Sequence, residues 1–154
     1  MPSVPSVGGF GERVRGLLHR ETKPVVPPTI LIVDGNPTSR ESLSEFLSSL
    51  GHDVAEAHTG LEALEKASTL QPDLIMMAVR LPGLNGDEVT AKLKRNISTR
   101  RIPIVISTGW TTEFNSEERI TRAVNAGAAQ IVYKPFQLPV LRDVLRTHMI
   151  NAAE

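Results

Sequence analysis

Short apolar runs alternate with longer stretches in which apolar residues recur every three or four positions, from Thr29 almost to the end of the chain. The runs have the length of buried strands, and the longer stretches have the period of amphipathic helices. Strands that alternate with helices are typical of a parallel sheet covered by helices. The pattern therefore predicts an α/β fold of five strand–helix units without an internal repeat. The predicted strands are 29–33, 53–57, 73–79, 103–107 and 129–133.

Capping residues and apolar stripes define the predicted helices. Asn36 can cap a helix whose first residue is Pro37 and which Gly51 ends, and Thr59 with Glu62 has the spacing of a capping box. In chain order, the apolar positions expected to face the core are Leu43, Phe46, Leu47 and Leu50; Leu61, Leu64, Ala67 and Leu70; Val89, Ala91 and Leu93; Ile120, Ala123 and Val124; and Leu141, Val144, Leu145 and Met149.

Residues 1–28 differ in composition from the rest of the chain. Residues 23–28 read Lys-Pro-Val-Val-Pro-Pro. Proline and the residue before it both favour extended backbone, so this stretch predicts an extended linker. Upstream, Phe10, Val14, Leu17 and Leu18 fall on one face of a helix. This stretch is either a frayed tail or a short helix that docks on a partner or a lipid surface, and its two glycines favour the tail. We predict a tail at 1–28, one domain at 29–150 and a short tail at 151–154.

Composition excludes several classes of protein. The chain has 154 residues, a usual length for one domain, and its 17 basic and 17 acidic residues create no overall field that would attract nucleic acid or an anionic membrane. It has no cysteine for a disulfide or a thiolate metal site. No apolar stretch reaches the length of a membrane span and the amino terminus lacks a secretory pattern, so we expect a cytoplasmic protein.

Candidate chemistry lies just after the apolar runs, because the functional crevice of an open parallel sheet lies beyond the carboxyl ends of its strands. The residues at these positions are Asp34, Ala78, Thr108 and Lys134. They include one carboxylate, one hydroxyl and one ammonium group.

Several motifs occur in an order that is similar to one known family. They are 30–34 (ILIVD) with Pro37 and Arg40, 72–74 (PDL), 81–86 (LPGLNG), 103–108 (PIVIST), 127–128 (GA) and 134–136 (KPF). Together these motifs resemble the receiver domain of bacterial two-component response regulators over residues 29–150. The resemblance implies a flavodoxin-like, doubly wound (βα)5 fold with a five-stranded parallel sheet in the order 2-1-3-4-5.

The resemblance also implies a phosphorylation site that this sequence has partly lost. In the family, two acids after the first strand and an aspartate after the third hold magnesium, and that aspartate accepts a phosphoryl group which a hydroxyl and a lysine contact. Asp34 matches the first acid, but Gly35 stands at the second and Ala78 at the acceptor position. Thr108 and Lys134 match the hydroxyl and the lysine. We therefore expect a degenerate pocket with weak or absent Mg²⁺ binding, no other cofactor, and a direct pair between Lys134 and Asp34.

No other residue is a good substitute for the missing acceptor. Asp73 begins a strand at the opposite end of the sheet, and the helix dipole accounts for Asp87. His58 is expected to be an exposed loop residue and Ser107 a core residue. We therefore predict no catalytic residue and no metal site, and classify the chain as a non-enzyme.

The switch and surface positions also depart from the family. Ile131 occupies the place of an aromatic residue that communicates with the threonine, and the role is not transferred to the nearby Tyr133. Trp110 lies in a loop that looks longer than usual, where it either contacts a partner or covers the altered pocket. With Phe10 and Leu17, Tyr133 and Trp110 form the predicted partner surface.

The favoured function is a phosphorylation-independent pseudo-receiver that binds protein partners, such as a histidine kinase or another signalling protein, as a monomer or weak homodimer. An alternative is a true receiver whose acceptor aspartate was changed to Ala78, although Gly35 would remain unexplained. A small-ligand-binding α/β domain is less favoured, because no glycine-rich loop follows the first strand.

DNA binding is not expected, since the one basic cluster reads as a solvated helix face. That cluster comprises Lys92, Lys94, Arg95, Arg100 and Arg101.

Overall fold

A five-stranded parallel sheet forms the centre of the structure, a computed structural model that describes residues 29–109 and 116–149. The strand order is β2-β1-β3-β4-β5, so the predicted α/β fold and its topology are confirmed. The strands are β1 (Thr29–Val33), β2 (Asp53–Ala57), β3 (Leu74–Ala78), β4 (Ile104–Thr108) and β5 (Gln130–Tyr133). The helices are α2 (Pro37–Ser49), α3 (Gly60–Leu70), α4 (Gly86–Arg95), α5 (Ser116–Ala126) and α6 (Leu138–His148).

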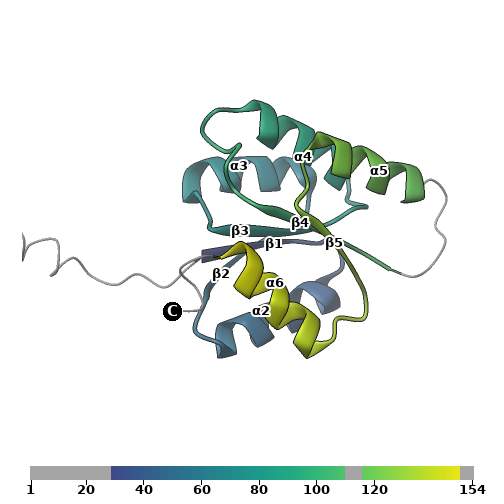
Figure 1. Cartoon of the computed structure of the whole chain (residues 1–154). Helices are drawn as coiled ribbons and strands as arrows, with labels where there is room; N and C mark the ends of the chain where they lie inside the picture. Colours follow the sequence, from purple (N-terminus) through teal and green to yellow (C-terminus); the bar gives the residue numbers. More distant parts are fainter. Residues whose placement is uncertain (1–28, 110–115, 150–154) are drawn as a thin grey trace, which may run out of the picture.

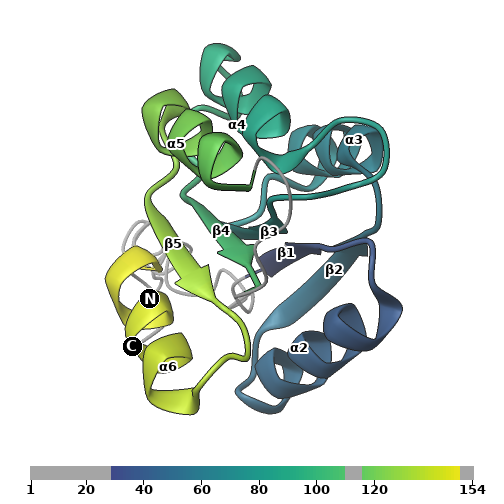
Figure 2. The same cartoon turned by 90° about the vertical axis from the view of Figure 1, so that its right-hand side faces the viewer.

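Helices cover both faces of the sheet and divide the core into two clusters. Figures 1 and 2 show α3, α4 and α5 on one face and α2 and α6 on the other. Successive side chains of β1 point to opposite faces of the sheet. Leu31 and Val33 pack in the cluster on the side of α3, α4 and α5, and Ile30 and Ile32 pack in the cluster on the side of α2 and α6. Central strands buried on both faces read as continuous apolar runs, which is why β1, β3 and β4 could be predicted from sequence. Within the described residues, no helix is long and apolar enough to cross a membrane.

The predicted helix starts are present. The side chain of Asn36 accepts a hydrogen bond from the Ser39 N–H at 3.1 Å, with Pro37 as the first helical residue. Thr59 Oγ1 accepts from the Glu62 N–H at 3.0 Å, but the Glu62 carboxylate accepts from the N–H of His58 rather than from that of Thr59. The second half of the predicted capping box is therefore displaced by one residue.

The predicted inward face of α3 was wrong at both ends. Leu61 is 62% exposed and Leu70 is 47% exposed, whereas the buried residues are Gly60, Ala63 and Ala67. The reason is the close approach of α3 to the loop before α4: a Cβ on Gly60 would lie 2.3 Å from the carbonyl oxygen of Leu84. Only the face made of small residues fits against this loop, so the two leucines face outward.

Leu50 and Val124 were also expected in the core and are exposed. Leu50 lies just beyond the last residue of α2, where the chain turns toward Gly51. Val124 follows Ala123, which is fully buried in α5, and two successive helical residues cannot both point straight inward. The stripe predicted for α6 is confirmed, because its residues and Met149 are all buried.

Candidate functional site

The four residues singled out at the strand ends lie along one edge of the sheet, because β1, β3, β4 and β5 are successive parallel neighbours. Asp34, Ala78 and Thr108 are all less than one tenth exposed. Lys134 directly follows β5 and donates its N–H to the carbonyl oxygen of Thr108 at 2.8 Å. Strand order therefore assembles this group from segments up to 100 residues apart in the chain.

A short ion pair joins the two ends of this edge. Lys134 Nζ lies 2.6 Å from Asp34 Oδ2, so the direct pair expected from the sequence is present. The other carboxylate oxygen of Asp34 accepts the N–H of Asn36 at 2.9 Å. Both oxygens of Asp34 therefore have a partner within the protein, and the lysine charge is compensated locally.

Arg40 supports the same carboxylate residue through its backbone. Its Nη1 donates to the carbonyl oxygen of Asp34 at 2.8 Å, and its Nε donates to Glu56 Oε1 at 3.0 Å. Sequence reasoning noted Arg40 only as a family landmark. The contact with Asp34 could have been inferred, since Arg40 lies in the first turns of the helix that follows Asp34. The contact with Glu56 could not, because Glu56 lies on β2, 16 residues away in the sequence.

Atoms of the segment that follows β3 lie close to Gly35 and to the backbone of Ala78. A Cβ on Gly35 would lie 3.1 Å from Cδ of Pro82. Behind Ala78, the backbone of Gly86 approaches so closely that an added Cβ would be 2.5 Å from the Ala78 carbonyl oxygen. The segment that follows β3 therefore lies close to position 35 and to the backbone of Ala78.

The donor set at this edge does not fit a magnesium site of three acids. Of the three positions that carry acids in the family, only position 34 has a carboxylate, and the ammonium group of Lys134 lies against one oxygen of Asp34. Across residues 29–109 and 116–149, no group of three or more His, Cys, Asp or Glu side chains is arranged to hold a metal ion. Magnesium prefers hard oxygen ligands, of which this edge offers few.

The residues considered as substitute acceptors lie where the sequence placed them. Asp73 precedes β3 at the opposite end of the sheet and accepts the N–H of Thr29 at 2.7 Å. His58 is exposed and contacts Glu62 at 2.9 Å. Ser107 is buried within β4.

Asp87 has a partner that the sequence did not reveal. Its carboxylate is only 4% exposed, and Arg119 Nη1 on α5 lies 3.2 Å from Oδ1 and 3.4 Å from Oδ2. Helix-dipole stabilisation alone, as inferred from the sequence, was therefore an incomplete explanation of Asp87. The pair joins the first turn of α4 to α5, close to the edge that carries the candidate site.

The interpretation of the basic cluster as a solvated face was wrong for Lys94. This side chain packs against Gly127 and donates to the carbonyl oxygens of Arg100 and Ile102 at 3.0 and 2.8 Å. Burial lowers the pKa of the Lys94 ammonium from its usual value. Lys92, Arg95, Arg100 and Arg101 are exposed.

The predicted switch and surface positions divide into two groups. Ile131 is half-buried against the core cluster on the α3–α5 side, and Tyr133 is 45% exposed on β5. Phe10, Leu17 and Trp110 lie outside the described residues.

Comparison with known proteins identifies the family. The sequence model of the response regulator receiver domain matches residues 30–146. The chain belongs to this family. It is therefore a receiver domain of the kind found in two-component signal transduction, and its relatives are bacterial.

Two relatives show the range of proteins that carry this domain. The chain is 35% identical over 141 residues to the sensor protein EvgS of Escherichia coli O157:H7, covering 90% of this chain but 11% of EvgS. It is 29% identical over 127 residues to the polar-differentiation response regulator DivK of Brucella anthropi, covering 82% of this chain and all of DivK. The receiver domain thus corresponds to a small part of one relative and to the whole of the other.

Solved structures agree with the fold. The receiver domain of the sensor histidine kinase PA1611 from Pseudomonas aeruginosa, which has a magnesium ion in its active-site cleft, is 28% identical with a TM-score of 0.72. That match covers 82% of this chain and all of the other. The chemotaxis protein CheY4 of Vibrio cholerae is 26% identical with a TM-score of 0.70, covering 80% of this chain and 99% of CheY4.

Removing the lysine of the site pair is expected to destabilise the receiver domain. Lys134→Met leaves the Asp34 carboxylate, whose side chain is 11% exposed, without its cation. We expect the free energy of unfolding to fall by about 2 kcal/mol at neutral pH, below the range for fully buried pairs because Lys134 is partly exposed. Urea denaturation followed by circular dichroism measures the loss.

Two further variants separate the ion pair from other effects of the substitution. Asp34→Asn with Lys134→Met is expected to recover most of the loss, because the amide oxygen can still accept the N–H of Asn36. Lys92→Met, on an exposed helix face, is the matched control. Equal stability of Lys134→Met and Lys92→Met would contradict the structural role of the pair.

Proposed function

We propose that this receiver domain is a pseudo-receiver, a module that binds protein partners in bacterial two-component signalling without being phosphorylated. The observation that carries the proposal is Ala78, whose methyl side chain stands at the carboxyl end of β3, the position of the phosphoacceptor in the family. Phosphoryl transfer to this position needs a carboxylate nucleophile, and alanine has no side-chain oxygen.

The neighbouring groups do not replace the lost nucleophile. Asp34 is the one carboxylate retained from the three acids, and Lys134 neutralises it at 2.6 Å. An attacking carboxylate oxygen would have to break this pair, and no second acid is present at position 35 to help bring in a metal ion. We therefore propose that Mg²⁺ binds weakly or not at all, in contrast to the PA1611 receiver domain.

The glycine at position 35 favours a natural loss over a single engineered change at Ala78. Position 35 is the place of the second acid in the family, and it carries no side-chain carboxylate in this sequence. One substitution of an aspartate by alanine would not account for this second feature.

The partners are proposed from the family and its relatives. EvgS is a sensor protein and DivK a response regulator, so a histidine kinase or another signalling protein is the expected class of partner. We assign binding to the domain of residues 29–150, acting as a monomer or weak homodimer, with 1–28 and 151–154 as extensions. The surface of this domain, rather than catalysis, is proposed to be its functional feature.

Incubation with a small-molecule phosphodonor tests the proposal. The protein is mixed with acetyl phosphate and Mg²⁺, and its intact mass is measured by electrospray mass spectrometry. We expect no phosphoryl adduct, because position 78 offers no nucleophile. A stable phosphoryl adduct on the unaltered chain would refute the pseudo-receiver function.

A restored variant provides the positive control. Gly35→Asp with Ala78→Asp returns both missing acids beside Asp34, Thr108 and Lys134. We expect this double variant to gain an Mg²⁺-dependent adduct, while Gly35→Asp alone gains none. The comparison shows whether the acids at 35 and 78 account for the difference from phosphorylatable relatives.

A further inference from the structure

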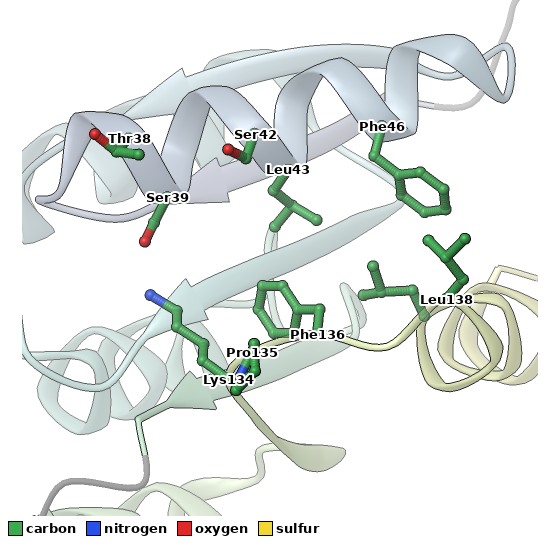
Figure 3. Close-up of a pocket in the computed structure, with 10 residues that line it drawn as sticks. Thr38, Ser39, Ser42, Leu43, Phe46, Lys134, Pro135, Phe136 and Leu138 are labelled. Atoms are coloured by element: carbon green, nitrogen blue, oxygen red, sulfur yellow. The ribbon is translucent and has the colours of Figure 1, made fainter.

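A mostly apolar groove lies between α2 and the segment that leads from β5 into α6. Its volume is about 630 Å³. Leu43 and Phe46 of α2 face Phe136, Leu138 and Leu141 across it, as Figure 3 shows for the four of these that it labels. Leu138 is 51% exposed, so part of this apolar wall is in contact with solvent. Exposed apolar surface of this kind indicates a binding site.

The groove has few polar groups that could orient a small ligand. Thr38, Ser39 and Lys134 lie together at one end of it, as Figure 3 shows. The ammonium group of Lys134 is already bonded to Asp34. Ligand sites combine apolar walls with convergent polar groups, and the remaining lining of this groove suits apolar side chains of a polypeptide better.

The chain itself carries a segment with the matching pattern. Phe10, Val14, Leu17 and Leu18 have the spacing of one face of a helix, and an amphipathic helix commonly binds a groove through residues at such positions. The stripe lies outside the described residues, and the pattern itself is that of a helix face able to bind an apolar groove.

The covalent connection places this segment within reach of the groove. Ile30 and Ile32 of β1 pack in the same core cluster as Leu43 and Leu141, which line the groove. Ten residues, 19–28, join the stripe to Thr29, and an extended chain of that length spans about 30 Å. A domain of 121 residues has a radius of gyration of about 14 Å. The linker is therefore long enough, and tethering gives the segment an effective concentration of about 1 mM at the groove.

Charge around the groove agrees with this occupant. Glu41 and Glu45 are exposed on α2, and residues 10–18 carry two basic residues, Arg13 and Arg15, and one acid, Glu12. Opposite charges that flank an apolar contact favour the encounter and fix its register. A second copy of the chain would lack the advantage of the tether at ordinary protein concentrations.

We propose that residues 10–18 bind as a short helix in the groove between α2 and α6 of the same chain. Phe10, Val14, Leu17 and Leu18 are inserted between the α2 wall and the α6 wall. The segment thereby occupies a partner-binding surface, and a protein that uses the groove must displace it. The proposal is independent of whether position 78 can be phosphorylated.

Paramagnetic relaxation enhancement on the full-length protein tests the contact. Because the chain has no cysteine, Ser6→Cys gives a single site for a nitroxide label just before the stripe. We expect strong loss of amide signal in α2 and the start of α6, and little loss in α3 and α4 on the other face of the sheet. Two substitutions are then added to the labelled Ser6→Cys protein. Leu17→Asp is expected to restore the amide signals of α2 and α6. Gly16→Asp makes the same change of charge off the apolar stripe and is expected to leave the signal loss unchanged.

The pattern of signal loss decides between occupants. Loss that is weak or uniform over the surface, or that persists in Leu17→Asp, would overturn the proposal and leave the groove to another molecule. A second sample detects contacts between copies. It mixes nitroxide-labelled protein at natural isotope abundance with ¹⁵N-enriched protein that carries no nitroxide. Signal loss in α2 and α6 in that mixture would assign the groove to the segment of a second copy and overturn docking within one chain.

Discussion

Replacing Arg119 by methionine is expected to lower the free energy of unfolding by about 3 kcal/mol, because it leaves a buried carboxylate without its cation. Asp87 is only 4% exposed, and Arg119 Nη1 contacts both of its oxygens. Methionine retains much of the apolar stem of arginine but has no charge and no donor. The start of α4 offsets part of the cost, since a helix amino terminus favours an acid, and this places the loss at the low end for buried pairs.

The same helix offers a matched control for this change. Arg122 on α5 forms an exposed pair with Glu118 at 3.0 Å, and exposed pairs contribute less than about 1 kcal/mol. Arg122→Met is therefore expected to be nearly neutral in urea denaturation, and Asp87→Asn with Arg119→Met to recover much of the loss. Similar unfolding midpoints for Arg119→Met and Arg122→Met would show that the buried pair does not hold α4 and α5 together.

The fold could be predicted from sequence because its central strands are buried on both faces. All five residues of β3 are buried, so the strand appears as a continuous apolar run. The inward face of α3 could not be predicted in the same way. Leu61 and Leu70 fit a helical period as well as Ala63 and Ala67 do, and the contact of Gly60 with Leu84, 24 residues away, decides between the two faces.

The candidate site was predictable where its residues follow the strands directly. Asp34, Thr108 and Lys134 each end or follow a strand, and the order of a doubly wound sheet brings such residues to one edge. The pairing of Asp87 with Arg119 was not predictable, because 32 residues separate them and a position at a helix start already offered one reason for an acid at 87. Pairing between distant helix surfaces depends on how the helices pack, which residue spacing does not specify.

At the carboxyl edge of the sheet, the chain retains Asp34 and Lys134 of the family's site but lacks the acids at positions 35 and 78. A receiver domain with three acids concentrates negative charge there, which a metal ion can neutralise. With Gly35 and Ala78 in place, the one remaining carboxylate is neutralised by Lys134 at 2.6 Å. Within the described residues, Lys134 thus neutralises the retained carboxylate, and we expect this structural role to be independent of phosphoryl transfer.

Gly86→Ala is expected to destabilise the receiver domain by about 3 kcal/mol, the upper part of the usual range for overpacking. The added Cβ would lie 2.5 Å from the carbonyl oxygen of Ala78 and 3.1 Å from Cα of Val79. Both are backbone atoms, and the Gly86 N–H is held to the carbonyl oxygen of Val79 at 2.8 Å. The higher helix propensity of alanine, worth about 1 kcal/mol, does not offset a clash that requires β3 or α4 to move.

Gly35→Ala is the matched control, since its one tight contact would be with the exposed ring of Pro82, at 3.1 Å, while the His58 carbonyl oxygen at 3.7 Å is at ordinary contact distance. Urea denaturation is expected to show a loss below about 1 kcal/mol for this variant, because a surface ring can shift by a few tenths of an ångström. In ¹⁵N NMR spectra, Gly86→Ala is further expected to shift the amide signals of Ala78 and Val79. If Gly86→Ala is as stable as Gly35→Ala and leaves those signals in place, the close approach of α4 to the end of β3 does not constrain the site.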